Sequence, residues 1–242
     1  MADLPEPADA KQPVREHVWE QLRSAKVARF PGARGRIPNF TGAEAAARLL
    51  TSRPEWQRAT TVKANPDSPQ LPVRIAALED GKTVYMAVPR LRDEHPFLKL
   101  DPERLDVPPR RAASIRGAHE HGEPVAVDEM PHVDLIVCGT VATNRHGARV
   151  GKGGGFSDLE FGLAVQTGIV DDDTVIATTV HPLQIVDDEL PETPHDFRVD
   201  LVVTPDEVLS CPRTNRPPGI LWDHLDDRKI TAIPVLAALA QR

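Results

Sequence analysis

Apolar and polar positions along the chain form two repeating patterns, which together predict helices that alternate with strands. Amphipathic stretches with an apolar stripe at helical spacing predict helices over residues 11–29, 42–50, 159–168 and from 233 to the end. Short continuous apolar runs predict strands over residues 73–78, 83–88, 133–138, 174–180 and 199–203, and a weaker run lies at 58–62. Residues 110–122 predict a further strand and helix. Such continuous runs are typical of strands covered on both faces.

This alternation predicts an α/β fold, in which helices cover both faces of a mainly parallel sheet in a three-layer α/β/α arrangement. The length of 242 residues is enough for one large core. We therefore expect a flexible arm over residues 1–10 and a single domain over residues 11–242. Residues 89–92 (Pro-Arg-Leu-Arg) follow a predicted strand at its carboxyl end, where open α/β sheets bind ligands.

Composition narrows the classes of function. The longest apolar runs are too short to span a membrane, and the acidic N-terminus lacks the basic and apolar blocks of a secretion signal. Two cysteines, Cys138 and Cys211, fit a reducing compartment, so we expect a cytoplasmic protein without a membrane partner. A net charge of −7 gives no basic field for nucleic acid, which makes a nucleic-acid partner unfavourable.

A glycine-rich stretch, residues 149–158 (Arg-Val-Gly-Lys-Gly-Gly-Gly-Phe-Ser-Asp), stands directly between a predicted strand and a predicted helix. Glycines let the backbone approach an anion without a Cβ in the way, and the N–H groups of the first helical turn then point at the anion. Ser157 and Glu160 have the spacing of a capping box at this helix start, and Lys152 adds a compact positive charge. The stretch predicts a phosphate cradle, against the alternative of a flexible surface loop.

Better-known motifs do not describe this stretch. Gly147 and Gly151 are one residue too close for the Walker spacing, and Gly153 occupies the position of its Ser/Thr. In a dinucleotide fingerprint that starts at Gly151, Phe156 falls on the last glycine. The sequence also has no C-x-x-C pair, no G-x-S-x-G elbow and no histidines at zinc-ligand spacing, which disfavours a zinc enzyme or a serine hydrolase.

Asp158 lies just inside the helix that would hold phosphate, where its carboxylate would repel the phosphate unless a cation intervened. Mg²⁺ usually takes one or two carboxylates together with phosphate oxygens and water. Asp158 and Asp196, which precedes another predicted strand, are therefore the candidate magnesium ligands. An ordinary capping aspartate is the alternative for Asp196.

Basic residues outside the glycine-rich stretch have open interpretations. Lys11 and Arg15 lie four residues apart and therefore on one face of the first predicted helix. From spacing alone, a solvated helix face is the favoured interpretation. Residues 29–36 form a basic loop, but a nucleic-acid interpretation lacks a platform of aromatic side chains there beyond Phe40.

Taken together and in this order, the motifs resemble a known family. Residues 133–137 (Val-Asp-Leu-Ile-Val), the stretch 149–158 and residues 194–205 (Pro-His-Asp-Phe-Arg-Val-Asp-Leu-Val-Val-Thr-Pro) resemble the 5-formyltetrahydrofolate cyclo-ligase (methenyltetrahydrofolate synthetase) family. The order and spacing agree over residues 11–209. Residues 36–40 (Arg-Ile-Pro-Asn-Phe) and 89–92 are most similar to the branch called methenyltetrahydrofolate synthetase domain-containing protein.

The resemblance implies a three-layer α/β/α fold, with ATP, Mg²⁺ and a reduced folate as ligands. In the implied reaction, MgATP phosphorylates the formyl oxygen of 5-formyltetrahydrofolate, and attack by N10 expels phosphate to give 5,10-methenyltetrahydrofolate, ADP and phosphate. By match to the family's motifs, the implied catalytic residues are Arg149 and Lys152, and the implied metal ligands are Asp158 and Asp196. The implied ATP-binding residues are Lys11, Arg15, Arg149, Gly151, Lys152, Gly153, Gly154, Gly155, Phe156 and Ser157.

The chain departs from the family's established cyclo-ligases on the folate side. Phe156 and Ser157 stand where those enzymes usually carry a Tyr-Tyr pair. Residues 63–69 (Lys-Ala-Asn-Pro-Asp-Ser-Pro) contain no glutamate to align with the one that faces the folate in those enzymes. A cyclo-ligase is the expected activity, and the alternative is a non-catalytic nucleotide- or folate-binding member that has lost the folate site.

Overall fold

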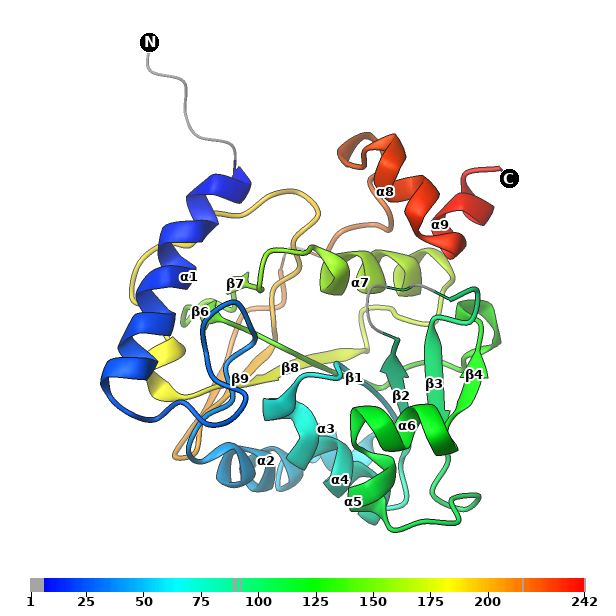
Figure 1. Ribbon diagram of the computed structural model, residues 1–242, viewed down its shortest axis with the longest axis horizontal. Coiled ribbons are helices and arrows are strands. Elements are labelled where there is room, and N and C mark those ends of the chain that lie inside the picture. Colours follow the sequence, from blue (N-terminus) through cyan, green and yellow to red (C-terminus); the bar gives the residue numbers. More distant parts are fainter. Residues whose placement is uncertain (1–6, 89–90, 92, 215, 242) are drawn as a thin grey trace.

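An eight-stranded sheet forms the middle layer of the computed structural model, which describes residues 7–88, 91, 93–214 and 216–241 (Figure 1). Its strand order is β10-β9-β8-β5-β1-β2-β3-β4. The strands are β1 (Thr61–Ala64), β2 (Thr83–Ala87), β3 (Phe97–Leu100), β4 (Glu123–Val125), β5 (Leu135–Cys138), β8 (Val175–Thr179), β9 (Leu201–Val203) and β10 (Val208–Ser210). Strands β9, β8, β5, β1 and β2 pair in parallel, and antiparallel strands lie at both edges. A mainly parallel sheet is thus confirmed.

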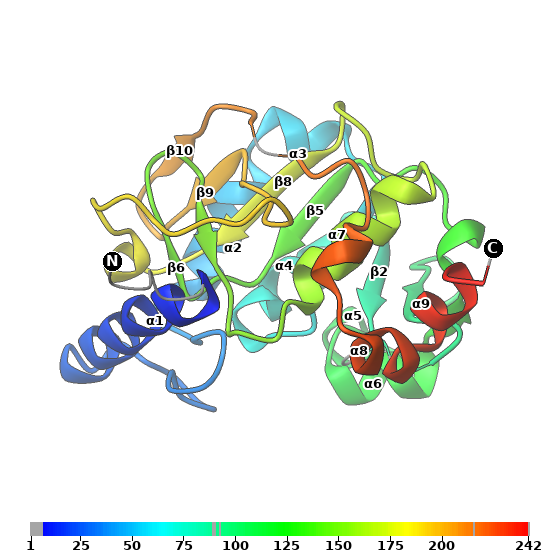
Figure 2. The ribbon, with the colours of Figure 1, turned by 90° about the horizontal axis from the view of Figure 1, so that it is seen from above.

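Helices cover both faces of the sheet (Figures 1 and 2). One face carries α2 (Ala43–Thr51), α3 (Pro54–Arg58), α4 (Leu71–Glu79), α5 (Pro109–Ala112) and α6 (Ile115–His121). The other carries α7 (Phe156–Gln166), with α8 (Asp227–Ala232) and α9 (Pro234–Leu239) beside it. Side chains of β5 alternate between the two layers: Leu135 and Val137 join the apolar core with α2 and α4, while Ile136 and Cys138 join the core with α7. The three-layer prediction is confirmed.

The first helix, α1 (Pro7–Ser24), packs at one end of the molecule against a small hairpin, β6 (Ala142–Thr143) and β7 (Arg149–Val150). Val18 and Leu22 of α1 are fully buried in an apolar cluster that includes Val150. The helix predicted over residues 11–29 is confirmed, but it begins at Pro7 and ends at Ser24. Of the expected arm, residues 7–10 are helical and residues 1–6 lie outside the described part of the chain.

The strand predicted over residues 73–78 is wrong, because these residues belong to α4. Parallel strands β1 and β2 need a crossover, and α4 supplies it with Pro72 in its first turn, where the missing N–H is not needed. Arg74 of α4 is buried and donates to the main-chain oxygens of Asn65 (2.5 Å) and Asp67 (3.2 Å). Burial lowers the pKa of Arg74 to about 10. This side chain fixes the loop between β1 and α4.

Other predicted elements agree with the structure in part. The runs at 83–88, 133–138, 174–180 and 199–203 are confirmed as β2, β5, β8 and β9, and the helix at 42–50 as α2. The strand predicted at 58–62 begins only at Thr61, and residues 110–122 form two helices, not a strand and a helix. Residues 89, 90 and 92 lie outside the described part of the chain. Within that part, none of the helices combines the length and apolarity needed to cross a membrane.

Candidate functional site

The glycine loop, residues 151–155, joins β7 to α7. Gly153 (φ +108°) and Gly155 (φ +65°) both adopt left-handed backbone that favours glycine. Gly155 immediately precedes α7 and offers no side-chain cap, so no side chain competes with an anion for the N–H groups of the first turn. The predicted capping box is wrong, because Ser157 lies inside the helix and Glu160 turns toward the sheet.

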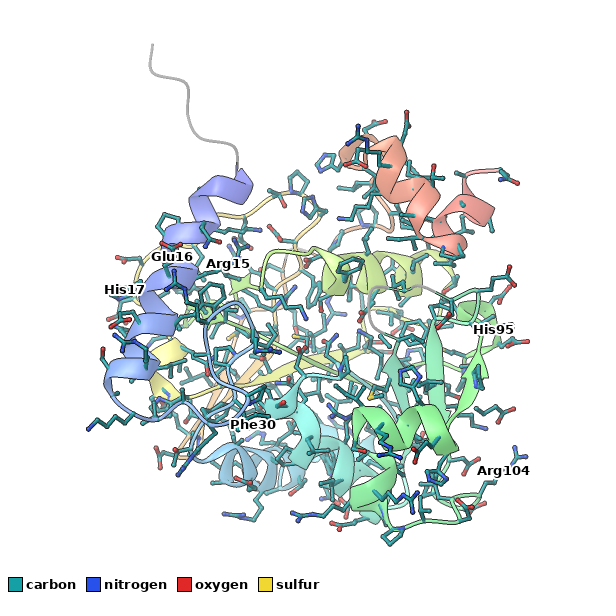
Figure 3. All side chains as sticks on the ribbon, in the orientation of Figure 1. Arg15, Glu16, His17, Phe30, His95 and Arg104 are labelled. Carbon is teal, nitrogen blue, oxygen red and sulfur yellow. The ribbon has the colours of Figure 1, made fainter. Side chains whose placement is uncertain are left out.

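Two basic side chains of α1, Lys11 and Arg15, face the interior. Both are buried, and Figure 3 shows Arg15 on the inner side of α1 and His17 on the outer side. Arg15 Nε donates to the main-chain oxygen of Gly151 at 2.7 Å. Lys11 Nζ lies 2.5 Å from Oδ2 of Asp196. The solvated-face interpretation is therefore wrong, and α1 brings both cations to the glycine loop and its surroundings.

Arg149 of β7 is a buried cation beside the glycine loop. Its Nη2 donates to Oδ1 of Asp158 at 2.6 Å, and its Nη1 donates to the main-chain oxygen of Gly139 at 3.1 Å. The guanidinium carbon lies 4.4 Å from the centre of the Phe197 ring. Burial by itself lowers the pKa of Arg149, but the charge and hydrogen bond of Asp158, together with the charges of Cys138 and Asp196, outweigh it and raise the pKa. Among the described residues, the buried Nε of Arg149 has no hydrogen-bond partner.

The predicted metal ligands, Asp158 and Asp196, belong to one electrostatic cluster, since the charges of both act on His195. Oδ2 of Asp196 accepts hydrogen bonds from Lys11 and from the main-chain N–H (2.6 Å) and hydroxyl (2.8 Å) of Thr193. Burial raises the pKa of Asp196, but these hydrogen bonds and the charge of Lys11 together outweigh it and hold the pKa below its ordinary value. The carboxylate is thus kept charged.

Both carboxylates keep one oxygen, Asp158 Oδ2 and Asp196 Oδ1, outside these contacts. In the described part of the chain, no three His, Cys, Asp or Glu side chains lie close enough together to hold a metal ion. Magnesium needs only one or two carboxylates when phosphate oxygens complete its coordination. The donor set fits Mg²⁺ that arrives with a phosphate chain.

Lys152, which belongs to the glycine loop, has a side chain that is 51% exposed. Its Nζ is 3.6 Å from Oδ1 of Asp67, which lies in the loop that Arg74 fixes. An ion pair this exposed contributes little to stability. It does link the glycine loop to the carboxyl end of β1, and no motif in the sequence had singled out Asp67.

A second polar network, sealed beneath the first turn of α7, was also missed. Lys63 of β1 forms an ion pair with Glu160 of α7, and both side chains are 5% exposed. Asn65 Nδ2 donates to the same carboxylate at 3.1 Å, while Asn65 Oδ1 accepts from the N–H of Gly139 (3.2 Å) and the hydroxyl of Ser157 (3.4 Å). The available signal was a lysine within an apolar strand, because a buried ammonium requires a partner.

The basic loop, residues 29–36, carries one exposed aromatic ring. Phe30 is 91% exposed (Figure 3), whereas Phe40 is buried in the core. Trp19 of α1 donates to the main-chain oxygen of Arg36 at 3.0 Å and so ties the loop to α1. The loop offers a single ring, whereas proteins that bind single strands stack successive bases on several.

Fold and site together define an α/β protein with basic side chains gathered around a glycine loop at the start of a helix. A profile of the 5-formyltetrahydrofolate cyclo-ligase family matches residues 7–205. The chain belongs to this family. The resemblance to this family, inferred from the glycine-rich stretch and the motifs on either side of it, is thereby confirmed.

Relatives within the family include longer proteins. The chain is 39% identical over 246 residues to the methenyltetrahydrofolate synthase domain-containing protein of Mus musculus and 36% identical over 245 residues to that of Homo sapiens. Each alignment covers 96% of this chain but only 64% and 62% of those proteins. The chain is also similar to the NMR structure of Aquifex aeolicus 5,10-methenyltetrahydrofolate synthetase, with a TM-score of 0.53 and 19% identity over 90% of this chain and 99% of that one. At this identity the likeness supports the fold alone.

Proposed function

We propose that this protein is an ATP- and Mg²⁺-dependent cyclo-ligase that acts on 5-formyltetrahydrofolate or a closely related reduced folate. One observation carries the proposal: basic side chains from separate parts of the chain converge on the glycine loop and on the two carboxylates, Asp158 and Asp196. Lys11 and Arg15 come from α1, Arg149 comes from β7, and Lys152 belongs to the loop itself. Positive charge around open backbone N–H groups suits a triphosphate.

Asp158 and Asp196 would hold Mg²⁺, which when bound neutralises charge on the phosphates. The chain orients both carboxylates beforehand, since Arg149 holds Asp158 and Lys11 holds Asp196. Phosphoryl transfer depends mainly on positioning and charge neutralisation. Arg149, itself fixed by its neighbours, and Lys152 are the proposed catalytic cations that stabilise the transferred phosphate.

In the proposed reaction, the γ-phosphate passes from ATP to the formyl oxygen, and N10 of the folate then closes the ring as phosphate leaves. The products are 5,10-methenyltetrahydrofolate, ADP and phosphate. We place the folate next to the carboxyl ends of β1 and β5, because Asn65 there accepts hydrogen bonds both from Gly139 and from Ser157 in the first turn of α7.

A second candidate function is nucleotide binding without cyclo-ligase activity. The observation in its favour concerns Phe156 and Ser157, which replace the family's usual tyrosine pair. The Phe156 ring has the ammonium of Lys229 5.8 Å from its centre, and the Ser157 hydroxyl donates to Asn65. Neither residue offers a free hydroxyl to a folate.

An absorbance assay for 5,10-methenyltetrahydrofolate, with ADP measured in parallel, separates the two candidates. Product that forms from 5-formyltetrahydrofolate with MgATP, and stops when Mg²⁺ is chelated, supports the cyclo-ligase. If no product and no ADP form with any reduced folate tried, the cyclo-ligase is refuted. MgATP binding in calorimetry without turnover then supports the second candidate, and efficient turnover excludes it.

A further inference from the structure

The chain continues past the part that the family profile matches, and the C-terminal segment, residues 219–240, packs along α7 (Figures 1 and 2). Ile233 and Leu236 of this segment are buried in one apolar cluster with Leu159 and Leu163 of α7. The segment is therefore attached to the helix that starts at the glycine loop.

One side chain of this segment, Lys229, reaches the loop itself. Its Nζ lies 3.5 Å from the main-chain oxygen of Gly154 and 5.8 Å from the centre of the Phe156 ring. A Cβ placed on Gly155 would stand only 3.2 Å from this Nζ. Asp226 caps α8 by accepting a hydrogen bond from the main-chain N–H of Lys229 at 2.6 Å, which fixes where the helix begins.

Lys229 differs from most cations around the loop in its partners. Lys11, Arg149 and Lys152 each face a carboxylate. Arg15 and Lys229 instead contact main-chain oxygens of the loop, and among the described residues Lys229 forms no ion pair with a carboxylate. An ammonium has three donors, so this arrangement leaves charge and hydrogen-bonding capacity for an incoming anion.

The segment also touches the other side of the site. Nδ1 of His224, in the short helix η5 (Trp222–His224), lies 3.1 Å from Nδ1 of His195, and the two rings meet edge to face. His195 directly precedes Asp196. The segment thus meets both the glycine loop and the loop that carries a proposed metal ligand.

From these contacts we propose that Lys229 is a phosphate-binding residue and that the C-terminal segment forms a wall of the nucleotide site. The inference rests on the proposed binding of MgATP. Together, Arg15 and Lys229 place one cation from each end of the chain at opposite ends of the loop, at Gly151 and Gly154.

Calorimetric titration of the full chain with MgATP tests the inference through Lys229→Met, which keeps most of the stem and removes the charge. We expect about ten-fold weaker binding, because a charge-assisted hydrogen bond to phosphate is lost. Lys229→Arg restores most of the affinity. Arg228→Ala, an exposed neighbour, is the matched control and binds like wild type. The salt dependence of the dissociation constant becomes less steep in Lys229→Met alone.

Three outcomes would overturn the inference. If wild type binds MgATP and Lys229→Met binds it equally well, the inference fails and the proposed function stands. If wild type does not bind MgATP, both fail together. Hydrogen exchange of the nucleotide-free proteins covers the third outcome: if Lys229→Met loses protection over α8 and α9, Lys229 holds the segment in place and not the phosphate.

Discussion

Asp158 and Glu160 stand two positions apart near the start of α7, yet their surroundings differ. Residues two apart on a helix are turned by about 200°, so the two carboxylates lie on nearly opposite faces. Asp158 faces Arg149 and keeps one oxygen outside that contact. Glu160 faces the sheet, where Lys63 and Asn65 both bind its Oε2.

The comparison separates two uses of the same chemistry. A sealed pair such as Lys63 and Glu160 has no route to a new partner, so its role is to hold α7 on β1. A pair that borders the glycine loop can exchange a partner when a ligand brings its own charge. Exposure ranks the pairs accordingly, from 5% for both side chains at Lys63 and Glu160 to 51% for Lys152 and 20% for Asp67.

The largest effect is expected where the sealed pair is broken. Lys63→Met leaves the Glu160 carboxylate buried without its cation, and we expect the free energy of unfolding to fall by about 3–5 kcal/mol. Urea unfolding measures it. The double variant Lys63→Met/Glu160→Leu is the control and recovers part of the loss, because no unpaired charge remains. If the free energy of unfolding of Lys63→Met lies within about 1 kcal/mol of the wild-type value, which is the order of a surface substitution, the comparison is contradicted.

An intermediate effect is expected at Asp196, which borders the site. The pKa of Asp196 is lower in the folded protein than in the unfolded chain, where it is about 3.9. The charged carboxylate therefore stabilises the fold at pH values above about 3.9, and this contribution is lost as the pH falls through the lower folded pKa. Asp196→Asn should therefore cost about 1–3 kcal/mol at neutral pH, and the difference from wild type should shrink below about pH 4. Urea unfolding in the presence of a chelator, from pH 7 to pH 3, measures this. A difference that stays constant over that range would show that the charge is unimportant.

The smallest effect on stability is expected at Lys152, the most exposed side chain in the pairs that are compared above. Lys152→Ala should leave the free energy of unfolding within about 0.5 kcal/mol of wild type, while MgATP binds about ten-fold more weakly. Thermal unfolding and calorimetry report the two quantities. Arg34→Ala, another exposed cation, serves as control with both unchanged. Loss of stability in proportion to loss of binding would place Lys152 with the structural pairs.

Much of the fold could be predicted because both-face burial leaves continuous apolar runs, as in β5 and β8. The strand prediction over residues 73–78 is wrong because a short buried helix and a buried strand share that pattern. The decisive factor was the parallel pairing of β1 and β2, which requires a crossover helix and is not visible in local sequence. Antiparallel β3 and β4, at the sheet edge, carried too weak a pattern to be predicted.

The candidate site divides in the same way. The glycines and Arg149 can be identified as site candidates from the sequence, since several glycines beside a helix start have few other uses than anion binding. Asp67 and Lys229 do not, because their relation to the loop depends on how distant segments pack. Spacing alone predicts that Glu160 takes part in a cap of α7. Only the packing of α7 against β1 shows that its carboxylate instead forms an ion pair with Lys63.

The position of α1 also bears on how the protein is made. Lys11 meets a partner 185 positions later in the chain, and Arg15 meets one 136 positions later. During synthesis α1 must therefore wait, with Val18 and Leu22 uncovered, until the residues that it packs against have been made. Such long-range closure is slow and leaves apolar surface open to chaperones or to aggregation. The proposed nucleotide site, which uses side chains of α1, would consequently form late in folding, when most of the chain is in place.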